Sequence, residues 1–357
     1  MVSGSRALSK MMGIVLALIV LVIVVGVAGY YAGSSIASVR TVTVTLTAPT
    51  TPPTTPAAMP AVMWPTRAVY VIVGWGVGGG TDIFARAVAP ILQNLTGVPW
   101  VVVNMPGASG AIAEDYVVKQ PADGYTVLFA PNTMINNIIT GTNKNPLSSY
   151  IPIALFQWDV GALWIRADDK RFKNIDEFLK YAKDNEVKIG GTGIGSTDHI
   201  NVYLFIKYSG IKGRYIPYER AGDMHKDLLG GSIDAMYEEP GIVYSLYEGG
   251  KIKPLFFYHS ERLKEFPDIP AITEYGWNIT LGVWRGVFVR AGTPPEIVEK
   301  LIDLCTKAYN SPEYKEFEKR QLLHYRSKLL VGDEFKKFIE KELEIYSKIL
   351  KELGIVS

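Results

Sequence analysis

Residues 68–95, AVYVIVGWGVGGGTDIFARAVAPILQNL, decide the fold class of this chain. The β-branched run at 68–73 ends in a glycine and is typical of a buried strand in a parallel sheet. A glycine-rich turn follows, and residues 81–95 then repeat apolar side chains at helical spacing. Thr81 or Asp82 is expected to be the N-cap of that helix. The stretch therefore predicts a strand, a glycine loop and a helix in direct succession.

Strands and helices continue to alternate on the C-terminal side of this stretch. The sequence predicts strands at 100–103 and 126–130, with a helix at 111–119 between them. A second alternating unit is expected to contain a helix at 174–183, a strand at 188–190, a helix at 197–208, a strand at 214–217, a helix at 224–230 and a strand at 233–237. This order implies parallel strands with right-handed crossovers. Helices at 293–309 and 333–353 are expected to follow as a helical tail, with Thr293 as the N-cap of the first. Asn174, with Glu177 three residues later, is expected to cap the helix at 174–183.

The N-terminus indicates where the chain works. Arg6 and Lys10 precede an uncharged apolar run at 11–32. Roughly 20 apolar residues span a bilayer as a helix, and positive charge before such a run keeps the N-terminus inside. We expect residues 1–32 to be an uncleaved transmembrane anchor, with signal cleavage near 35–37 as the alternative. Both interpretations place the remainder of the chain outside the cytoplasm.

Thr, Pro and Ala dominate the segment that follows the apolar run. A segment of this composition cannot pack a core and is typical of an extended, semi-rigid stalk. Residues 33–66 are therefore expected to be a Thr/Pro-rich linker that holds a globular head away from the membrane.

Composition argues against several function classes. The chain has 37 Lys and Arg against 35 Asp and Glu, a formal net charge of +2, so we expect no nucleic-acid partner. Cys305 is the single cysteine, which excludes an intrachain disulfide, and one Cys with four His makes a metal site hard to build. No Ser/His/Asp or Cys/His set has the spacing of a nucleophilic triad. The sequence therefore predicts no metal and no cofactor, and it gives no sign of nucleophilic catalysis.

The glycine loop at 74–79 matches G-x-G-x-x-G between a strand and a helix. A dinucleotide site also needs an acid about 20 residues further on, at the end of the second strand. That strand ends in Asn104, and no Asp or Glu occurs between Leu95 and Ala113, which argues against a nicotinamide enzyme. The loop either forms a tight strand–helix turn or presents backbone N–H groups to an anion such as a carboxylate.

A second glycine loop strengthens the anion interpretation. Residues 190–197, GGTGIGST, again follow a predicted strand and precede a predicted helix. Each of the two α/β units thus has a glycine-rich helix N-terminus. We expect the two loops to face each other across a cleft and to hold one anionic ligand from both sides.

Several sequence blocks then identify a resemblance that covers about residues 68–325. They are GGGTD at 78–82 with Ala85 and Arg86, VVNMPGASG at 102–110, PADGYT at 121–126, GSTDH at 195–199, DLLGGSID at 227–234, Arg262 with PDIPAITE at 267–274, and AGTP at 291–294. In this order the blocks resemble the receptor of tripartite tricarboxylate transporters, also called the Bug family. Gly74 and Gly76 stand where that family usually has prolines around an aromatic residue, and Met105 stands where it often has arginine.

The resemblance implies an α/β fold of the periplasmic-binding-protein type, a two-domain Venus flytrap. It implies a first domain at 67–160, a second domain at 161–282 and a return to the first domain with the C-terminal helices at 283–357. It also implies a small carboxylate as ligand (a di- or tricarboxylate, an amino acid or an aromatic acid), no catalysis, and membrane permease subunits as partners. Closure is expected about the strands near 154–164 and 283–289. A sensory binding protein that signals to a membrane kinase is the alternative function.

The resemblance also implies which residues bind the ligand. In the family, backbone N–H groups and hydroxyls of the two glycine loops hold the carboxylate. The corresponding candidates are Trp75, Gly78, Gly79, Gly80, Thr81, Asp82, Asn132, Thr133, Gly193, Gly195, Ser196, Thr197 and His199. Some of these residues also have purely structural interpretations.

Asp82 is either an N-cap or a ligand contact. His199 is either a packed side chain or a ligand contact. Trp75 either stacks on the ligand or covers the floor of the cleft. Glu238 and Glu239 lie in a solvated loop or meet a ligand amine.

Overall fold

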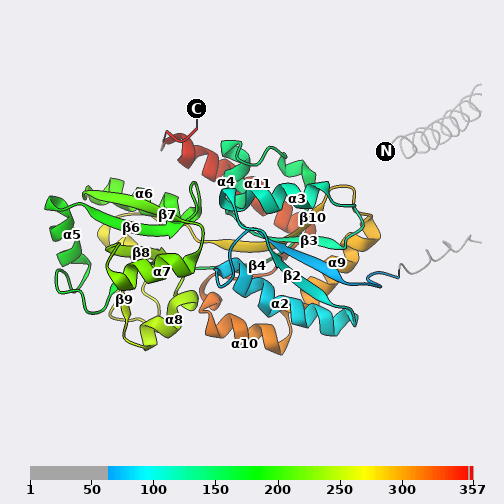
Figure 1. Ribbon diagram of the computed structural model, residues 1–357, viewed down its shortest axis with the longest axis horizontal. Coiled ribbons are helices and arrows are strands. Elements are labelled where there is room, and N and C mark those ends of the chain that lie inside the picture. Colours follow the sequence, from blue (N-terminus) through cyan, green and yellow to red (C-terminus); the bar gives the residue numbers. More distant parts are fainter. Residues whose placement is uncertain (1–62, 353, 357) are drawn as a thin grey trace, which may run out of the picture. The chain divides into compact units, whose positions relative to one another are not determined.

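The computed structural model describes residues 63–352 and 354–356. The predicted anchor at 1–32 and nearly all of the linker at 33–66 lie outside the described residues. Among the helices of the described part of the chain, none combines the length and the apolar character needed to cross a bilayer. The described residues form two lobes, each built on its own β-sheet (Figure 1).

The first lobe contains a six-stranded sheet with the order β11-β4-β10-β3-β1-β2. The strands are β1 (Val69–Val73), β2 (Trp100–Asn104), β3 (Thr126–Pro131), β4 (Tyr150–Trp158), β10 (Trp284–Arg290) and β11 (Leu330–Val331). β1 pairs in parallel with β2 and β3, as the predicted β-α-β order requires. On the other side of β3 lies β10, which pairs antiparallel with both β3 and β4. β11 in turn pairs antiparallel with β4.

Helices cover the first sheet and bury its apolar side chains. They are α2 (Gly80–Thr96), α3 (Ala111–Lys119), α4 (Thr133–Thr140), α9 (Pro295–Tyr309), α10 (Pro312–Arg320) and α11 (Gly332–Glu352), with short 3₁₀ turns at Ala108–Gly110, Leu147–Ser149 and Leu323–Tyr325. Phe84 of α2 packs its ring against Phe129 and Phe156 at centroid distances of 5.1 and 5.3 Å. This packing fixes the N-terminal part of α2 against β3 and β4.

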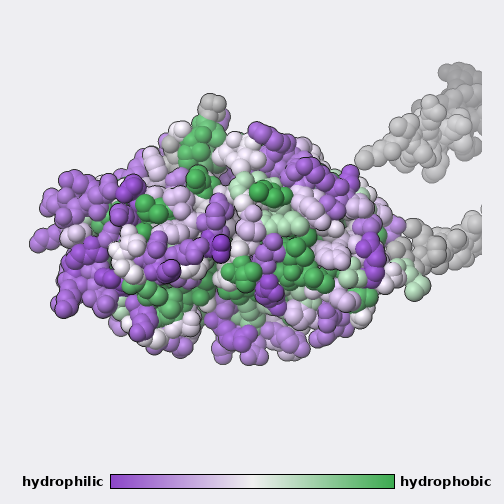
Figure 2. All heavy atoms as spheres, viewed as in Figure 1, coloured by the Kyte–Doolittle hydropathy of each residue, from purple (hydrophilic) through white to green (hydrophobic). Residues whose placement is uncertain are grey.

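The second lobe contains a five-stranded sheet with the order β7-β6-β8-β5-β9. Its strands are β5 (Ala162–Arg166), β6 (Val187–Thr192), β7 (Gly213–Tyr218), β8 (Ala235–Glu238) and β9 (Ile252–Phe257), and its helices are α5 (Ile175–Asp184), α6 (Thr197–Ser209), α7 (Ala221–Gly230) and α8 (Pro240–Glu248), followed by a 3₁₀ turn at Ile272–Tyr275. β6 is parallel to β7 and β8, whereas β5 is antiparallel to β8 and β9. Figure 2 shows hydrophilic side chains over the outer end of this lobe, where α5 exposes its polar face.

Three segments connect the lobes. The chain leaves the first sheet at the end of β4, enters the second at β5, and returns just before β10. Helix α11 is the third connection, visible in red in Figure 1. Its first half places Phe335 and Ile339 in an apolar cluster of the first lobe, and its second half places Tyr346 and Leu350 in the core of the second. The end of the chain therefore belongs to both lobes.

Of the three helix starts for which a cap was predicted, two differ from the prediction and one is confirmed. Gly79 is the N-cap of α2, not Thr81 or Asp82, because Asp82 is the third helical residue and its carboxylate accepts the N–H of Gly78. Helix α9 begins at Pro295 after Pro294, so Thr293 is not its cap. The Asn174 cap of α5 is confirmed, since its side chain accepts the N–H of Glu177 at 3.0 Å.

Candidate functional site

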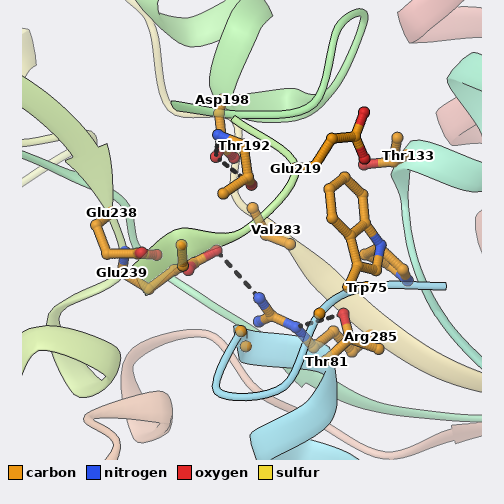
Figure 3. Close-up of a pocket in the computed structure, with 15 residues that line it drawn as sticks. Trp75, Thr81, Thr133, Thr192, Asp198, Glu219, Glu238, Glu239, Val283 and Arg285 are labelled. Carbon is orange, nitrogen blue, oxygen red and sulfur yellow. Dashed lines mark hydrogen bonds and ion pairs between the residues drawn. The ribbon is translucent and has the colours of Figure 1, made fainter. Parts of the chain in front are cut away.

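A cavity lies between the two lobes and is lined from both. The lining residues are Trp75, Gly76, Gly79, Gly80, Thr81, Pro131, Thr133, Val283 and Arg285 from the first lobe and the strand leading into it, and Thr192, Asp198, Glu219, Ala221, Glu238 and Glu239 from the second. Figure 3 shows their arrangement. The volume open to the centre of a water molecule is about 40 Å³, a few times what one water requires. The cavity is therefore narrow.

Several helices begin at this cavity. Gly80, Thr133 and Ala221 are the first residues of α2, α4 and α7. Glu239 directly precedes the first residue of α8. The parallel strands cause this convergence, since their carboxyl ends lead into helix N-termini at one edge of each sheet. N–H groups in the first turn of a helix lack intrahelical partners and carry partial positive charge. The cavity therefore suits an anionic group, and the N–H groups of Gly80 and Thr81 are the nearest donors on α2.

Arg285 adds a buried positive charge beside these helix starts. Its side chain is 5% exposed and forms ion pairs with Asp159 and with Glu239, the latter at 3.3 Å. Its Nε also lies 3.4 Å from the Thr81 hydroxyl oxygen. Burial alone would lower the pKa of Arg285, but the charges of Asp159 and Glu239 outweigh it and raise the pKa. The guanidinium is therefore charged.

Position 80 requires a glycine because the Arg285 side chain packs against its backbone. A Cβ at this position would be 2.6 Å from the guanidinium carbon of Arg285 and 2.9 Å from Cδ1 of Ile242. The backbone of α2 consequently approaches the guanidinium directly. This packing explains the third glycine of the run better than turn geometry does, because Gly80 has helical backbone angles rather than a positive φ.

Carboxylates dominate the second lobe's wall of the cavity. Asp198, Glu238 and Glu239 are each at most 6% exposed. Asp198 accepts the N–H and the hydroxyl of Thr192, both at 2.8 Å. Burial and the charge of Glu239 raise the pKa of Asp198 and also that of Glu238. The cavity thus has a wall that prefers positive charge or protons.

His225 is the histidine next to this wall. Its Nε2 lies 2.9 Å from the Glu238 carboxylate. Burial lowers the pKa of His225 more than the charge of Glu239 raises it. The ring is therefore neutral near pH 7 and adds no positive charge to this wall.

Five of the predicted binding residues line the cavity: Trp75, Gly79, Gly80, Thr81 and Thr133. The other candidates of the first lobe lie behind its wall. Asp82 binds Arg86, Asn104 and the N–H of Gly78, which holds the glycine loop in shape. Burial would raise the pKa of Asp82, but these hydrogen bonds outweigh it and lower the pKa. Asn132 donates to the Gly282 carbonyl and to the Tyr346 hydroxyl.

Residues 193–197 of the second glycine loop do not line the cavity, and the N–H groups of residues 193–195 already have protein acceptors. The N–H of Gly193 donates to the Tyr218 carbonyl at 2.9 Å. Ile194 donates to the Ser109 hydroxyl, and Gly195 donates to Nδ1 of His199, each at 3.1 Å. The cavity is instead reached by the residues on either side of this stretch, Thr192 and Asp198.

The remaining candidates on α6 also have structural partners. Ser196 caps the helix by accepting the N–H of His199 at 3.2 Å. The Thr197 hydroxyl lies 3.5 Å from the Tyr346 hydroxyl. His199 stacks on Tyr215 at a centroid distance of 4.4 Å, and burial lowers its pKa. The packed interpretation of His199 is the one that this geometry favours.

Direct contacts between the lobes surround the second loop. Ser109 donates to the Ile194 carbonyl and accepts the Ile194 N–H, both at 3.1 Å. The Asn136 amide donates to the Gly195 carbonyl at 2.8 Å. Trp75 lies so close to Gly193 that a Cβ there would be 2.8 Å from its ring. The lobes are therefore closed on each other at this loop.

Sequence reasoning missed Arg285, Asp159 and Asp198. Arg285 stands inside the apolar strand WRGVFVR, and a charge within a buried strand is a signal that was available. Glu238 and Glu239 were noted, but the solvated-loop interpretation is wrong because both are buried.

Comparisons with known proteins agree with this architecture. A family model described as the tripartite tricarboxylate transporter family receptor matches residues 84–355. Protein BugT of Bordetella pertussis is 28% identical over 298 residues, which are 82% of this chain and 90% of BugT.

Two solved structures are also similar. A TctC solute binding protein from Polaromonas is 31% identical, with a TM-score of 0.60 over 81% of this chain and 99% of that one. A protein of R. palustris solved with adipate is 26% identical, with a TM-score of 0.74 over 82% and 98%. The expected two-lobed α/β fold of the periplasmic-binding-protein type is thereby confirmed. The chain belongs to the tripartite tricarboxylate transporter receptor family, a family of extracytoplasmic solute-binding proteins that are not enzymes.

Proposed function

We propose that this receptor captures a small carboxylate in the cavity between its lobes and delivers it to the membrane permease subunits of a tripartite tricarboxylate-type transporter. The observation that carries the proposal is the start of α2 beside the buried Arg285, at the boundary of the two lobes. A relative of known structure was solved with adipate, a dicarboxylate. The apolar run at 11–32 tethers the receptor to the membrane.

In this proposal the ligand carboxylate accepts the N–H groups of Gly80 and Thr81. The hydroxyls of Thr81 and Thr133 and the charge of Arg285 add to its stabilisation, since charge-assisted hydrogen bonds are the stronger class. Trp75 covers the ligand's carbon chain. The Gly193–Gly195 loop acts by closing on Ser109, rather than by donating its N–H groups to the ligand.

Closure links binding to delivery. A ligand held by both lobes stabilises the closed form over the open one by its difference in affinity for the two. The membrane subunits then recognise the arrangement that exists only when the lobes meet, which includes the contact of Ser109 with Ile194.

Titration calorimetry on the full-length chain in detergent, freed of co-purified ligand by unfolding and refolding, tests the proposal. The probes are succinate, adipate, citrate, aspartate and benzoate. Binding of at least one of them with a dissociation constant below 100 μM is expected, and its loss in Arg285→Met is expected as well. If every probe fails to bind to refolded protein with a native circular dichroism spectrum, the proposal is wrong.

A further inference from the structure

The cavity is lined by more acidic than basic side chains. Asp198, Glu238 and Glu239 line it and are buried, and Glu219 lines it with its side chain exposed. Among the described residues that line it, Arg285 is the cation, and its charge is shared with Asp159, which lies behind the wall. The nearby Arg220 packs along Gly76 at the surface and lies 3.8 Å from Asp223. A ligand that carried only negative charge would be repelled by each of these acids that is ionised and would require the others to stay protonated.

Two buried carboxylates on this wall have unused hydrogen-bonding capacity. Asp198 uses Oδ2 for both of its contacts with Thr192, and its Oδ1 accepts no hydrogen bond from the described residues. Glu239 uses Oε1 for Arg285, and its Oε2 likewise has no donor among them. Thr133, 4% exposed, has a hydroxyl with no partner in the described part of the chain. None of these three atoms is among the fully buried atoms that lack a partner in the described residues, so each is accessible from the cavity, where water or a ligand can supply its hydrogen bonds.

The basic and the acidic side chains lie on different walls of the cavity, and the ion pair of Arg285 with Glu239 joins them. Figure 3 shows Arg285 and Thr81 on one wall and Asp198 with Thr192 on the opposite wall, while Glu239 reaches in from the side. Helix N-termini strengthen the positive character of the first wall, because Gly80 and Thr81 open α2 there. The site therefore has an anion-binding end and a cation-binding end.

A metal ion does not fit the cation-binding end. Across the described residues, no three His, Cys, Asp or Glu side chains are close enough together to hold one. An ammonium group does fit, because it has three N–H donors for acceptors such as the free oxygens of Asp198 and Glu239. The narrow cavity also favours a short ligand.

We infer that the ligand is a small aminocarboxylate, a carboxylate that also carries a protonated amine. Its carboxylate lies at the start of α2 beside Arg285, and its ammonium group lies between Asp198 and Glu239. This inference rests on the proposed function and names the ligand class of the same cavity. The acids select for the amine, because an ammonium group compensates the charge of an ionised acid, whereas opposite an uncharged or anionic group a buried acid must stay protonated or remain uncompensated.

Pairs of compounds that differ only by an amine test this inference. The pairs are propionate with alanine, succinate with aspartate, glutarate with glutamate, and adipate with 2-aminoadipate, titrated into the same full-length refolded protein. In at least one pair the amino compound is expected to bind at least 10-fold more tightly than its partner. Asp198→Asn and Glu239→Gln are each expected to reduce that ratio at least 10-fold. Glu344→Gln, the same type of change on the exposed face of α11, is expected to leave it unchanged.

The outcomes separate this inference from the proposed function. If the compound without the amine binds equally well or better in every pair, the aminocarboxylate assignment is overturned and the receptor function stands. Uptake of protons when a dicarboxylate binds, measured from the buffer dependence of the binding enthalpy, would likewise overturn it. Such uptake would mean that the acidic side chains of the cavity become protonated to accept an anion, so that no amine is needed. Failure of every compound overturns both. The comparison within each pair uses the unmodified protein, so it does not depend on the variants folding.

Discussion

Replacing Gly80 by alanine changes one methyl group at the point where α2 meets Arg285. The new Cβ would lie 2.6 Å from the guanidinium carbon, whereas carbon atoms in ordinary contact are about 3.5 Å apart. The guanidinium must move by roughly 1 Å, which breaks its 3.3 Å contact with Glu239. Removing one partner of a buried ion pair costs about 3–5 kcal/mol. Because Asp159 remains beside the displaced group, we expect a loss of about 2–3 kcal/mol.

The assay is thermal and urea unfolding of the full-length protein together with ligand titration. A loss of this size lowers the unfolding midpoint by roughly 4 to 6 °C, and binding of any carboxylate is expected to fall at least 10-fold. Gly230→Ala is the matched control, because a Cβ at this helical position meets nothing within 4 Å. Alanine is favoured over glycine in helices by up to about 1 kcal/mol, so the control is expected to be at least as stable as the parent.

A Gly80→Ala variant as stable as the parent and with unchanged affinity would refute this reasoning. It would mean that Arg285 moves freely in its cavity and that its ion pairs are not fixed. Destabilisation without loss of binding would place Arg285 in the structural framework only and would remove it from the site.

Three further predictions concern the loops and the buried acids. Ser109→Ala removes two hydrogen bonds to Ile194, and hydrogen exchange in the 193–195 loop is expected to rise about 30-fold, since each bond contributes about 1 kcal/mol. Burial raises the pKa of Glu114 to about 7, despite hydrogen bonds from Asn137 and Asn143, so ionising it opposes folding. The free energy of unfolding should fall by about 2–3 kcal/mol between pH 5 and 7.5 because Glu114 ionises. Urea unfolding of Glu114→Gln over the same pH range should not show this decrease. Asp82→Asn should lower the free energy of unfolding by about 2–4 kcal/mol at pH 7. Because the pKa of Asp82 is lowered in the folded protein, this difference between parent and variant should decrease only when the pH falls below 3.8, the ordinary pKa of the group.

Each of these predictions has a contrary result. Unchanged exchange in Ser109→Ala would mean that the lobes are held together elsewhere. A constant stability difference between parent and Glu114→Gln from pH 5 to 7.5 would show that Glu114 titrates normally. An Asp82→Asn variant whose stability matches the parent at pH 7 would show that the carboxylate does not hold the glycine loop.

Local patterns were enough to predict most of the fold. Helix α3 has the predicted bounds, and the strands before both glycine loops are parallel as expected, because β-branched runs and helical periodicity are encoded in neighbouring residues. The antiparallel pairing of β10 with β3 and β4 joins segments that are far apart in sequence. Periodicity carries no information on such pairing.

The binding residues were harder to predict than the fold. The first loop was found because its glycines, Thr81 and Trp75 are consecutive or nearly so. Arg285 lies 204 residues after Thr81, and only the folded chain brings them together. The N–H groups of Gly193 and Gly195 look available in the sequence, but Tyr218 and His199 occupy them in the fold. Availability of a backbone group depends on its tertiary partners, which composition cannot supply.

Helix α11 has a consequence for how independent the two lobes are. Tyr346 and Leu350 complete the core of the second lobe. Tyr346 also receives the Asn132 amide from the first lobe. A second lobe produced without this helix would therefore lack both part of its own core and its link to the first lobe. The two lobes are not separable into independently stable domains, and a chain cut before Tyr346 would have an apolar gap in the second lobe.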